Sequence, residues 1–527
     1  MKTYKKQIII TSLLILLTLL IGCSQEQSQS ETLKGSAEND SSKQAINDND
    51  TMEEKIIRLS GGDSGLPNPF RHVSRGPGIS KMHLIYDSLI EKDEEGNIPW
   101  LAKDWEISED GLEYIFFLEE DVFWQDGELL TAEDVKFTFD YYKKHSPVSN
   151  ALYVHDEYII ESTEVLDALT VKITLNSPNP SYFTDVGFMR IIPKHIWESI
   201  EDPKSYDGEG KVIGSGPFVM ESYNLQEGTY RYKAFDNYWG LNQKVDYIEW
   251  VPVSDTIMAF ENEEIDLINV SADLISRYKD DSEFTLISKH SYHSYRLLLN
   301  MEKRDELKEL NIRQGMAYAI DQQNLIDVVE RGSGEIASMG YVPSVHYWYN
   351  NNVKDYEYNL EQAKELLEDT QLTFELLTGN SNDEIRIAEL IQNDFREVGI
   401  ELKIESVDNR ARDGAVVEGK YELVLINSGG MGSDPSYLSN TYGEGSLPGY
   451  YNEEIQQLLI EQDKELDNDK RKELVFQLQE LIAEEVPIIM LYGPVDNNVY
   501  RHGHYDGWMF RYDHNKATHN KLSYLER

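Results

Sequence analysis

The chain has 527 residues, of which 40% are apolar and 11% aromatic. A chain of this length exceeds what one hydrophobic core usually holds, so we expect two or three lobes. Its formal net charge of −46 repels nucleic acid and anionic membrane surfaces, and neither is expected as a direct partner of the protein surface. A single cysteine, Cys23, excludes internal disulfides, cysteine-pair redox chemistry and cysteine-based metal clusters.

The first 22 residues have the pattern of a secretory signal peptide. A lysine-containing head precedes the apolar run Ile8–Ile21, whose length of about 14 residues is short for a membrane span of ~20. The sequence Leu20-Ile21-Gly22-Cys23 resembles the lipobox of bacterial lipoproteins. This resemblance implies lipidation of Cys23 and cleavage just before it, so that the chain is anchored to the outer face of the cell membrane. The alternative is an inert cysteine at the end of an uncleaved anchor helix.

Residues 23–52 are predicted to form a disordered tether. The stretch after Cys23 is rich in Ser, Gln, Asn, Asp and Glu and has no aromatic residue, so it buries too little apolar surface to offset the entropy of ordering. Globular structure is expected to begin with a short apolar strand at Lys55–Leu59, which ends at Gly61-Gly62.

The second half of the chain mixes helices and strands. Apolar residues at helical spacing predict a helix over 387–398 that stops at Gly399, and alternation predicts a strand over 400–404. A further strand, 421–426, leads into the glycine-rich loop 427–432. Ligands of α/β sheets bind at the carboxyl ends of strands, so this loop is the first candidate site.

Two acidic amphipathic helices are predicted over 453–466 and 469–483, followed by a buried strand over 486–492. Their apolar stripes are expected to face the core. Together with the preceding elements they indicate the α/β class.

No catalytic motif is present in the sequence: it has no phosphate loop, HExxH, GxSxG or dinucleotide fingerprint. Gly214-Ser215-Gly216-Pro217 suits a tight turn better than a phosphate cradle. His502 and His504 are placed to share a strand face, but nearby histidines favour a polar surface over a metal site. We therefore predict no enzyme activity, no cofactor and no metal site.

One segment, Trp100–Tyr142, carries a specific resemblance. It contains a turn at Asp110-Gly111, an alternating strand that follows it, and Thr131 as a helix N-cap with Asp134 three residues on. The segment resembles the signature region of the family 5 extracellular solute-binding proteins of ABC importers, the oligopeptide, dipeptide and nickel binders.

Other blocks continue the resemblance in order along the chain. They are Tyr86–Leu89, Ile192–Trp197, Gly214–Phe218, Asn237–Gly240 and Asn311–Asp321. In the last block Gly315 stands where the family has a helix-favouring alanine, at a local cost of up to ~1 kcal/mol.

The resemblance implies a two-lobed periplasmic-binding-protein-like α/β fold with an extra domain and a hinge between the lobes. Carried onto this sequence, it places lobe I at 53–90, 205–300 and 495–527. The extra domain is then 91–204 and lobe II 301–494.

The ligand class stays open at this stage. In peptide-binding members an aspartate four residues before the proline of the glycine-rich loop anchors the amino terminus of the peptide. Here the proline is Pro435, the equivalent position is Met431, and Asp434 is not clearly a substitute. An oligopeptide remains the leading prediction. The first alternative is nickel or a metal chelate, which is favoured by the missing aspartate and by His346, His502 and His504. A second alternative is another small solute. A third is a sensor lipoprotein without a transport role.

The predicted ligand contacts follow from the implied fold. From lobe II they are Asn427, Ser428, Gly429, Gly430 and Met431, with Leu66 opposite in lobe I and Tyr492 at the side. Trp348 and Tyr349 are expected either to stack on the ligand or to fill the core. The expected partners are the permease subunits of an ABC importer, with its ATPase subunits reached indirectly. The binder itself is expected to be monomeric.

Overall fold

The computed structural model describes residues 54–73, 76–154, 157–290, 292–368, 370–428, 432, 434–511, 516–518 and 520–527. Several sequence predictions lie outside the described residues. These are the signal peptide 1–22, the lipidated Cys23, the tether up to residue 52, and Gly429, Gly430 and Met431 of the glycine-rich loop.

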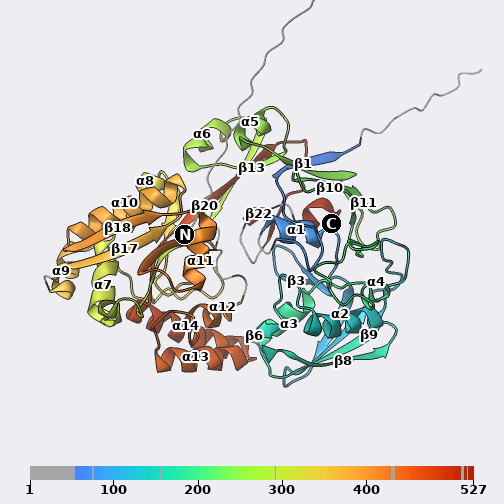
Figure 1. Ribbon diagram of the computed structural model, residues 1–527, viewed down its shortest axis with the longest axis horizontal. Helices are drawn as coiled ribbons and strands as arrows, with labels where there is room; N and C mark the ends of the chain where they lie inside the picture. The colour runs from blue at the N-terminus through green and yellow to red at the C-terminus, as the bar shows by residue number, and fades with distance from the viewer. Residues whose placement is uncertain are drawn as a thin grey trace, which may run out of the picture. The chain divides into compact units, whose positions relative to one another are not determined.

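A four-stranded sheet opens the described chain and contains the predicted first strand (Figure 1). Its order is β1 (Ile56–Gly61), β12 (Tyr247–Pro252), β11 (Thr229–Ala234) and β10 (Phe218–Asn224). The strands β1 and β12 are parallel, and the other pairs are antiparallel. Residues far apart in sequence therefore build this sheet, as the expected re-entry of the chain into lobe I requires.

A second four-stranded sheet is antiparallel and is covered by one long helix. Its order is β4 (Ala102–Ile107), β5 (Glu113–Leu118), β9 (Thr170–Leu175) and β8 (Ile160–Asp167), and α2 (Ala132–Lys144) packs on it. The predicted cap of α2 is present, because Thr131 and Asp134 form a reciprocal capping box.

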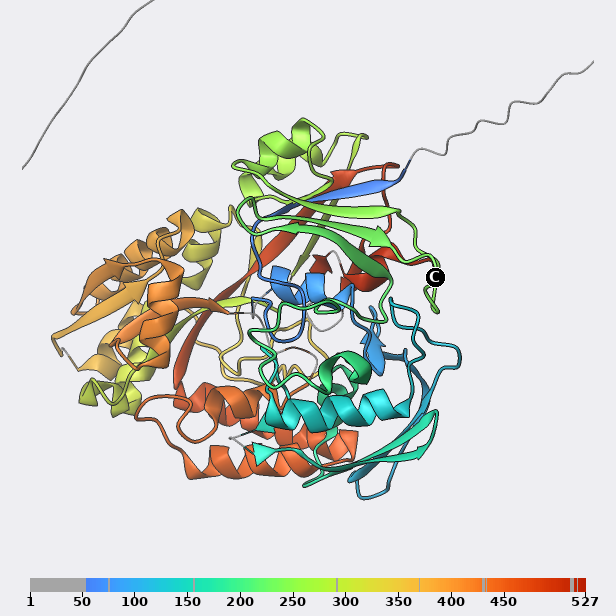
Figure 2. The same cartoon turned by 45° about the vertical axis from the view of Figure 1, so that its right-hand side comes forward.

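The largest sheet has eight strands. Six of them form the path β13 (Leu267–Asn269), β20 (Ile488–Arg501), β15 (Ser294–Leu299), β19 (Leu423–Ser428), β17 (Leu372–Thr378) and β18 (Ile400–Ser406). The other two, β14 (Phe284–His290) and β16 (Gly334–Ile336), also pair with β20. Figure 2 shows β20 as one long strand. Its first part pairs with β15 and its last part with β14.

The remaining elements are short hairpins and helices. The hairpins are β2–β3 (Ile90–Lys92, Asn97–Pro99), β6–β7 (Tyr153–Val154, Glu157–Tyr158) and β21–β22 (Met509–Arg511, Lys516–Thr518). The helices up to residue 300 are α1 (Pro77–His83), α3 (Pro180–Gly187), α4 (Lys194–Trp197), α5 (Thr256–Glu261) and α6 (Ile275–Tyr278). The later helices are α7 (Leu310–Ala319), α8 (Gln322–Val329), α9 (Leu360–Leu367), α10 (Asn382–Arg396), α11 (Asn409–Val417), α12 (Tyr437–Tyr442), α13 (Glu453–Lys464) and α14 (Asn468–Glu485). Within the described residues no helix has the length and apolar character needed to cross a membrane.

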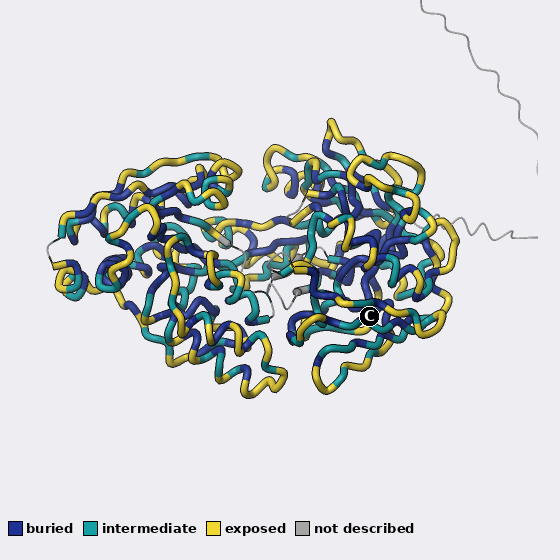
Figure 3. Tube along the Cα trace, turned by 60° about the horizontal axis from the view of Figure 1, so that its bottom comes forward, coloured by how far each residue is buried: buried dark blue, intermediate teal, exposed yellow. Residues whose placement is uncertain are grey.

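Two large hydrophobic cores organise the unit Glu54–Arg527. The first core draws its buried side chains from Ile57–Trp250 and Tyr500–Tyr524, and the second from Tyr295–Tyr492. In Figure 3 the buried segments run through the interior of each core and exposed segments cover the outside. The strand β20 belongs to both regions, since Ile488–Tyr492 pair with β15 and Val495–Arg501 pair with β14.

The prediction of an α/β fold is confirmed, with one boundary that differs. The helix α10 is followed by Gly399 at φ 83° and by β18, as the sequence predicts. The strand predicted over 486–492 instead begins at Ile488 and runs to Arg501. Val486 is not part of it, because this residue takes a left-handed conformation (φ 47°) that ends α14.

Candidate ligand-binding site

A cavity of about 250 Å³ opens on the first core. It is lined by residues from the turn 69–72, α1, Lys92 of β2, the stretch 142–151 and the stretch 184–190 at the end of α3. Most of its walls are apolar, among them Met82, Phe188 and Met189. Pockets for whole small ligands usually measure roughly 300–1,000 Å³, so this cavity suits a small ligand or one end of a longer one.

Asp185 is the one carboxylate among the described residues that line the cavity. It lies in the last turn of α3, which begins where Asn179 accepts a hydrogen bond from the Ser181 N–H and Pro180 occupies the first turn. The Asp185 side chain is half-buried, and its hydrogen-bond partner is the Ser181 hydroxyl, which donates to Oδ2 at 3.5 Å. Burial raises the pKa of Asp185 to about 7. The positive charge of Lys92 opposes this rise, and the negative charge of Asp434 adds to it.

His72 also lines the cavity. Its Nδ1 lies 2.8 Å from the Val73 carbonyl oxygen, which assigns the ring proton to Nδ1 and leaves Nε2 as an acceptor. This Nε2 is buried without a hydrogen-bond partner among the described residues. Burial lowers the pKa of His72 and so favours the neutral ring, despite the opposing hydrogen bond to Val73.

The end of the glycine-rich loop is held by two contacts within the second core. The carboxylate of Asp434 accepts two hydrogen bonds from Arg471, at 2.8 and 2.9 Å. The Nε2 of His346 lies 2.7 Å from the Gly432 carbonyl oxygen, and its Nδ1 accepts the Trp348 N–H at 3.2 Å. Asp434 and His346 are therefore both engaged in positioning the loop.

Comparison with known proteins shows the family to which the chain belongs. Residues 97–447 match the family described as bacterial extracellular solute-binding proteins, family 5 Middle. The chain belongs to the family 5 extracellular solute-binding proteins.

Individual relatives in this family differ in the ligand that their names give. The chain is 27% identical to the dipeptide-binding protein of Escherichia coli K12 over 441 residues, covering 75% of this chain and 80% of that protein. It is 25% identical to the nickel-binding periplasmic protein of the same organism over 391 residues, covering 68% and 72%. The structure of the oligopeptide-binding protein AppA of Bacillus subtilis in complex with a nonapeptide superposes with a TM-score of 0.75 at 20% identity, covering 90% of this chain and 100% of AppA. The predicted periplasmic-binding-protein-like fold is thereby confirmed.

The predicted contact residues of this family 5 protein do not line the cavity within the described part of the chain. Leu66 is buried beside the turn at Asn68, and Asn427 is exposed on β19, opposite Tyr295 of β15. The backbone of Ser428 pairs with β15 in the same ladder. The hydroxyl of the buried Tyr492 donates to Glu330 at 2.9 Å. Their role in ligand contact stays a prediction.

The histidines considered for metal binding are spread apart and engaged elsewhere. His502 and His504 face Asp506 at 3.8 Å and Asp266 at 3.3 Å, and both rings are largely exposed. Among the described residues no three His, Cys, Asp or Glu side chains come close enough to share a metal ion.

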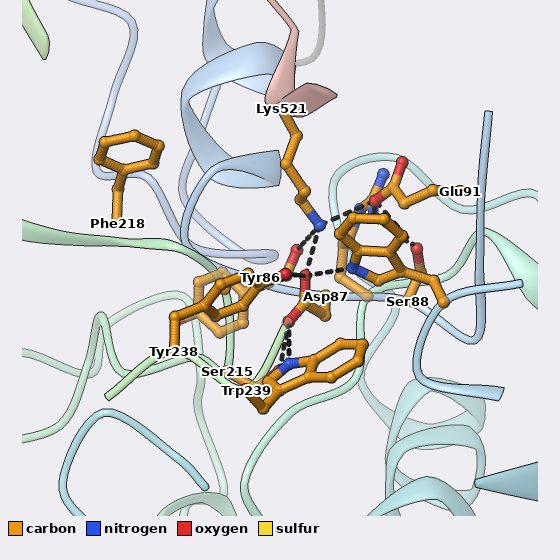
Figure 4. A network of polar contacts seen from close by, with 12 residues as sticks. Tyr86, Asp87, Ser88, Glu91, Ser215, Phe218, Tyr238, Trp239 and Lys521 are labelled. Carbon is orange, nitrogen blue, oxygen red and sulfur yellow. Dashed lines mark hydrogen bonds and ion pairs between the residues drawn. The ribbon is translucent and has the colours of Figure 1, made fainter. Parts of the chain in front are cut away.

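A buried ion network borders the cavity and is shown in Figure 4. The Nζ of Lys521 donates to Asp87 at 2.6 Å and to Glu91 at 2.8 Å, and Arg190 donates to Glu91 at 2.5 Å. Asp87 also accepts hydrogen bonds from Ser215 and from the indoles of Trp100 and Trp239. This network ties the C-terminal segment to the first core, and Arg190 also forms part of the cavity wall.

Sequence reasoning missed Asp185 and His72. With 95 acidic residues in the chain, no single aspartate stands out, and His72 lies in no recognisable motif. Only the fold brings the stretches around residues 72 and 185 to one cavity.

Proposed function

We propose that this protein captures an oligopeptide between two lobes and delivers it to the permease of an ABC importer. The carrying observation is the family match over residues 97–447, supported by a dipeptide-binding relative that is 27% identical. The family is one of solute-binding proteins, and on this ground we propose that the protein is not an enzyme.

The domain division follows the two cores. We propose that lobe I (53–90, 205–300 and 495–527) and the extra domain (91–204) form around the first core, and lobe II (301–494) around the second. The strand β20 and the passage from β14 to β15 are the connections between them. These connections are the proposed hinge, about which the lobes close on the ligand.

The cellular localisation is proposed from the sequence. Cleavage before Cys23 and lipidation of its thiol anchor the protein to the outer face of the cell membrane, and residues 23–52 act as a tether that reaches the permease. Serine in place of Cys23 is expected to release the protein into the medium, as cell fractionation would show. Retention of that variant in the membrane contradicts the anchor.

Nickel binding is the second candidate, and it is favoured by the nickel-binding relative. The structure gives it less support. The ring of His346 is engaged with Gly432 and Trp348, so it is not available as a ligand without rearrangement.

Thermal unfolding of the full-length protein separates the two candidates. A ligand at 100 times its dissociation constant stabilises the folded state by about 2.7 kcal/mol. We expect peptide pools to raise the unfolding temperature and nickel with histidine to leave it unchanged. Stabilisation by nickel–histidine alone overturns the peptide proposal, and a lack of response to both favours another solute or a sensor role.

A further inference from the structure

The buried and half-buried acids around the cavity differ in whether they have a counter-charge. Glu91 is paired with Arg190 and Lys521, and Asp434 is paired with Arg471. Among the described residues Asp185 makes no ion pair with a Lys or Arg nitrogen, although it lies in an apolar cavity. A carboxylate in such surroundings is costly unless a cation accompanies it.

The position of Asp185 relates it to both lobes. Its helix α3 contacts α13 of the second core, and the negative charge of Asp434 is near enough to raise the pKa of Asp185. Asp185 therefore lies on a helix of the first core that packs against the second core. Lys92 also lines the cavity and lies over the Phe188 ring at 4.4 Å, and its positive charge opposes the rise in the pKa of Asp185.

We propose that Asp185 is the ligand-binding residue that accepts an ammonium group of the bound peptide. The inference rests on the proposed function. An ammonium has three N–H donors, and Asp185 offers it a carboxylate; the neutral ring of His72, whose buried Nε2 has no hydrogen-bond partner among the described residues, lines the same cavity.

A compact ammonium fits these observations better than a metal ion. A metal ion needs several ligands, and no group of three candidate side chains is found in the described part of the chain. The ammonium belongs either to the amino terminus of the peptide or to a lysine side chain, and the experiment must separate these sources.

Calorimetric titration of the full-length protein at pH 7 with three peptides tests the proposal. The peptides are tetra-alanine with a free amino terminus, its N-acetylated form, and an N-acetylated tetrapeptide with one lysine. The protein variants are wild type, Asp185→Asn and the matched control Asp394→Asn. Asp394 is also a half-buried acid whose pKa burial raises to about 6, but it lies on α10 of the second core and accepts a hydrogen bond from the Asp321 N–H.

We expect Asp185→Asn to weaken binding of at least one ammonium-bearing peptide by about tenfold or more and Asp394→Asn to leave it unchanged. The peptide that loses affinity identifies the source of the ammonium. Equal binding of both ammonium-bearing peptides by wild type and Asp185→Asn overturns the inference while leaving the proposed function intact. If wild type binds none of the peptides, the proposed function fails and the inference with it.

Unfolding measurements guard against a trivial loss of structure. Because Asp185 is costly as a charged group, Asp185→Asn is expected to unfold at a temperature no lower than wild type at pH 8. A variant that binds poorly and also unfolds earlier would assign Asp185 a structural role and contradict the proposal.

Discussion

Two neighbouring regions of the first core handle buried charge in opposite ways. In the network of Asp87, Glu91, Arg190 and Lys521, two carboxylates meet two cations inside the protein. Burial alone would raise the pKa of Glu91, but the charges and hydrogen bonds of Arg190 and Lys521 lower it to about 2. In the adjoining cavity burial prevails, and the pKa of Asp185 rises to about 7. The balanced region holds the fold together. In the unbalanced one Asp185 makes no ion pair with a Lys or Arg of the described residues, although Lys92 and Arg190 also line the cavity, and the ligand is proposed to supply that partner.

Removal of a cation from the balanced region should have the largest effect. Lys521→Met leaves Asp87 and Glu91 buried with less counter-charge, and we expect it to lower the free energy of unfolding by about 3–5 kcal/mol. Chemical denaturation at pH 7 measures the loss. Lys303→Met, at an exposed lysine, is the matched control and should change stability by less than about 0.5 kcal/mol. If the two variants are equally stable, the network is not structural.

A smaller effect is expected where a buried acid has only a neutral partner. Burial raises the pKa of Glu330, and the hydroxyl of Tyr492 lowers it by hydrogen bonding. Tyr492→Phe removes that donor and should cost about 1–2 kcal/mol in denaturation at pH 7. A loss of peptide affinity in this variant without a matching loss of stability would instead support the predicted contact between Tyr492 and the ligand.

The unbalanced region predicts that ligand affinity depends on pH. An ammonium binds the ionised form of Asp185, whose pKa is about 7, so the affinity for a lysine-free peptide with a free amine should fall about fivefold between pH 7 and pH 6. Peptide amines stay charged over this range. Calorimetry with Asp185→Asn should show a flat profile, and an equal slope in both proteins would place the titrating group elsewhere. The charged or titratable groups that line the cavity or interact with Asp185 are His72, His83, Lys92, Tyr114, Tyr142, Tyr182, Arg190 and Asp434.

Much of the fold could be predicted because local chemistry and tertiary structure agree. The capping box of Thr131 and the positive φ of Gly399 are local features with one favourable solution. The face of α14 was harder to place. Its buried apolar side chains are Val475, Leu478, Ile482 and Ala483, while the neighbouring Leu474 and Leu481 are only partly buried. Because apolar residues occupy adjacent positions of this helix, the sequence does not fix which of them face the core. The elements that pack against the helix decide it.

The candidate site was less predictable because distant stretches build it. The loop 427–432 could be proposed from its strand and glycines, yet Asp434 turned out to be held by Arg471, which is 37 positions away. Asp185 meets residues from α1 and from the turn at His72 only after the first core has folded. No local sequence pattern predicts these contacts between distant residues.

Proton release on binding is the most direct measurement of the central claim, that Asp185 is completed by the charge of the ligand. At pH 7 this carboxyl is about half protonated, so binding of an ammonium should release about half a proton from Asp185, reduced by the roughly 0.1–0.2 proton that a free amino terminus takes up at this pH. Calorimetry in buffers of different ionisation enthalpy gives this number. The account predicts that Asp185→Asn releases none at all. No release by wild type, or the same release by both proteins, would contradict it.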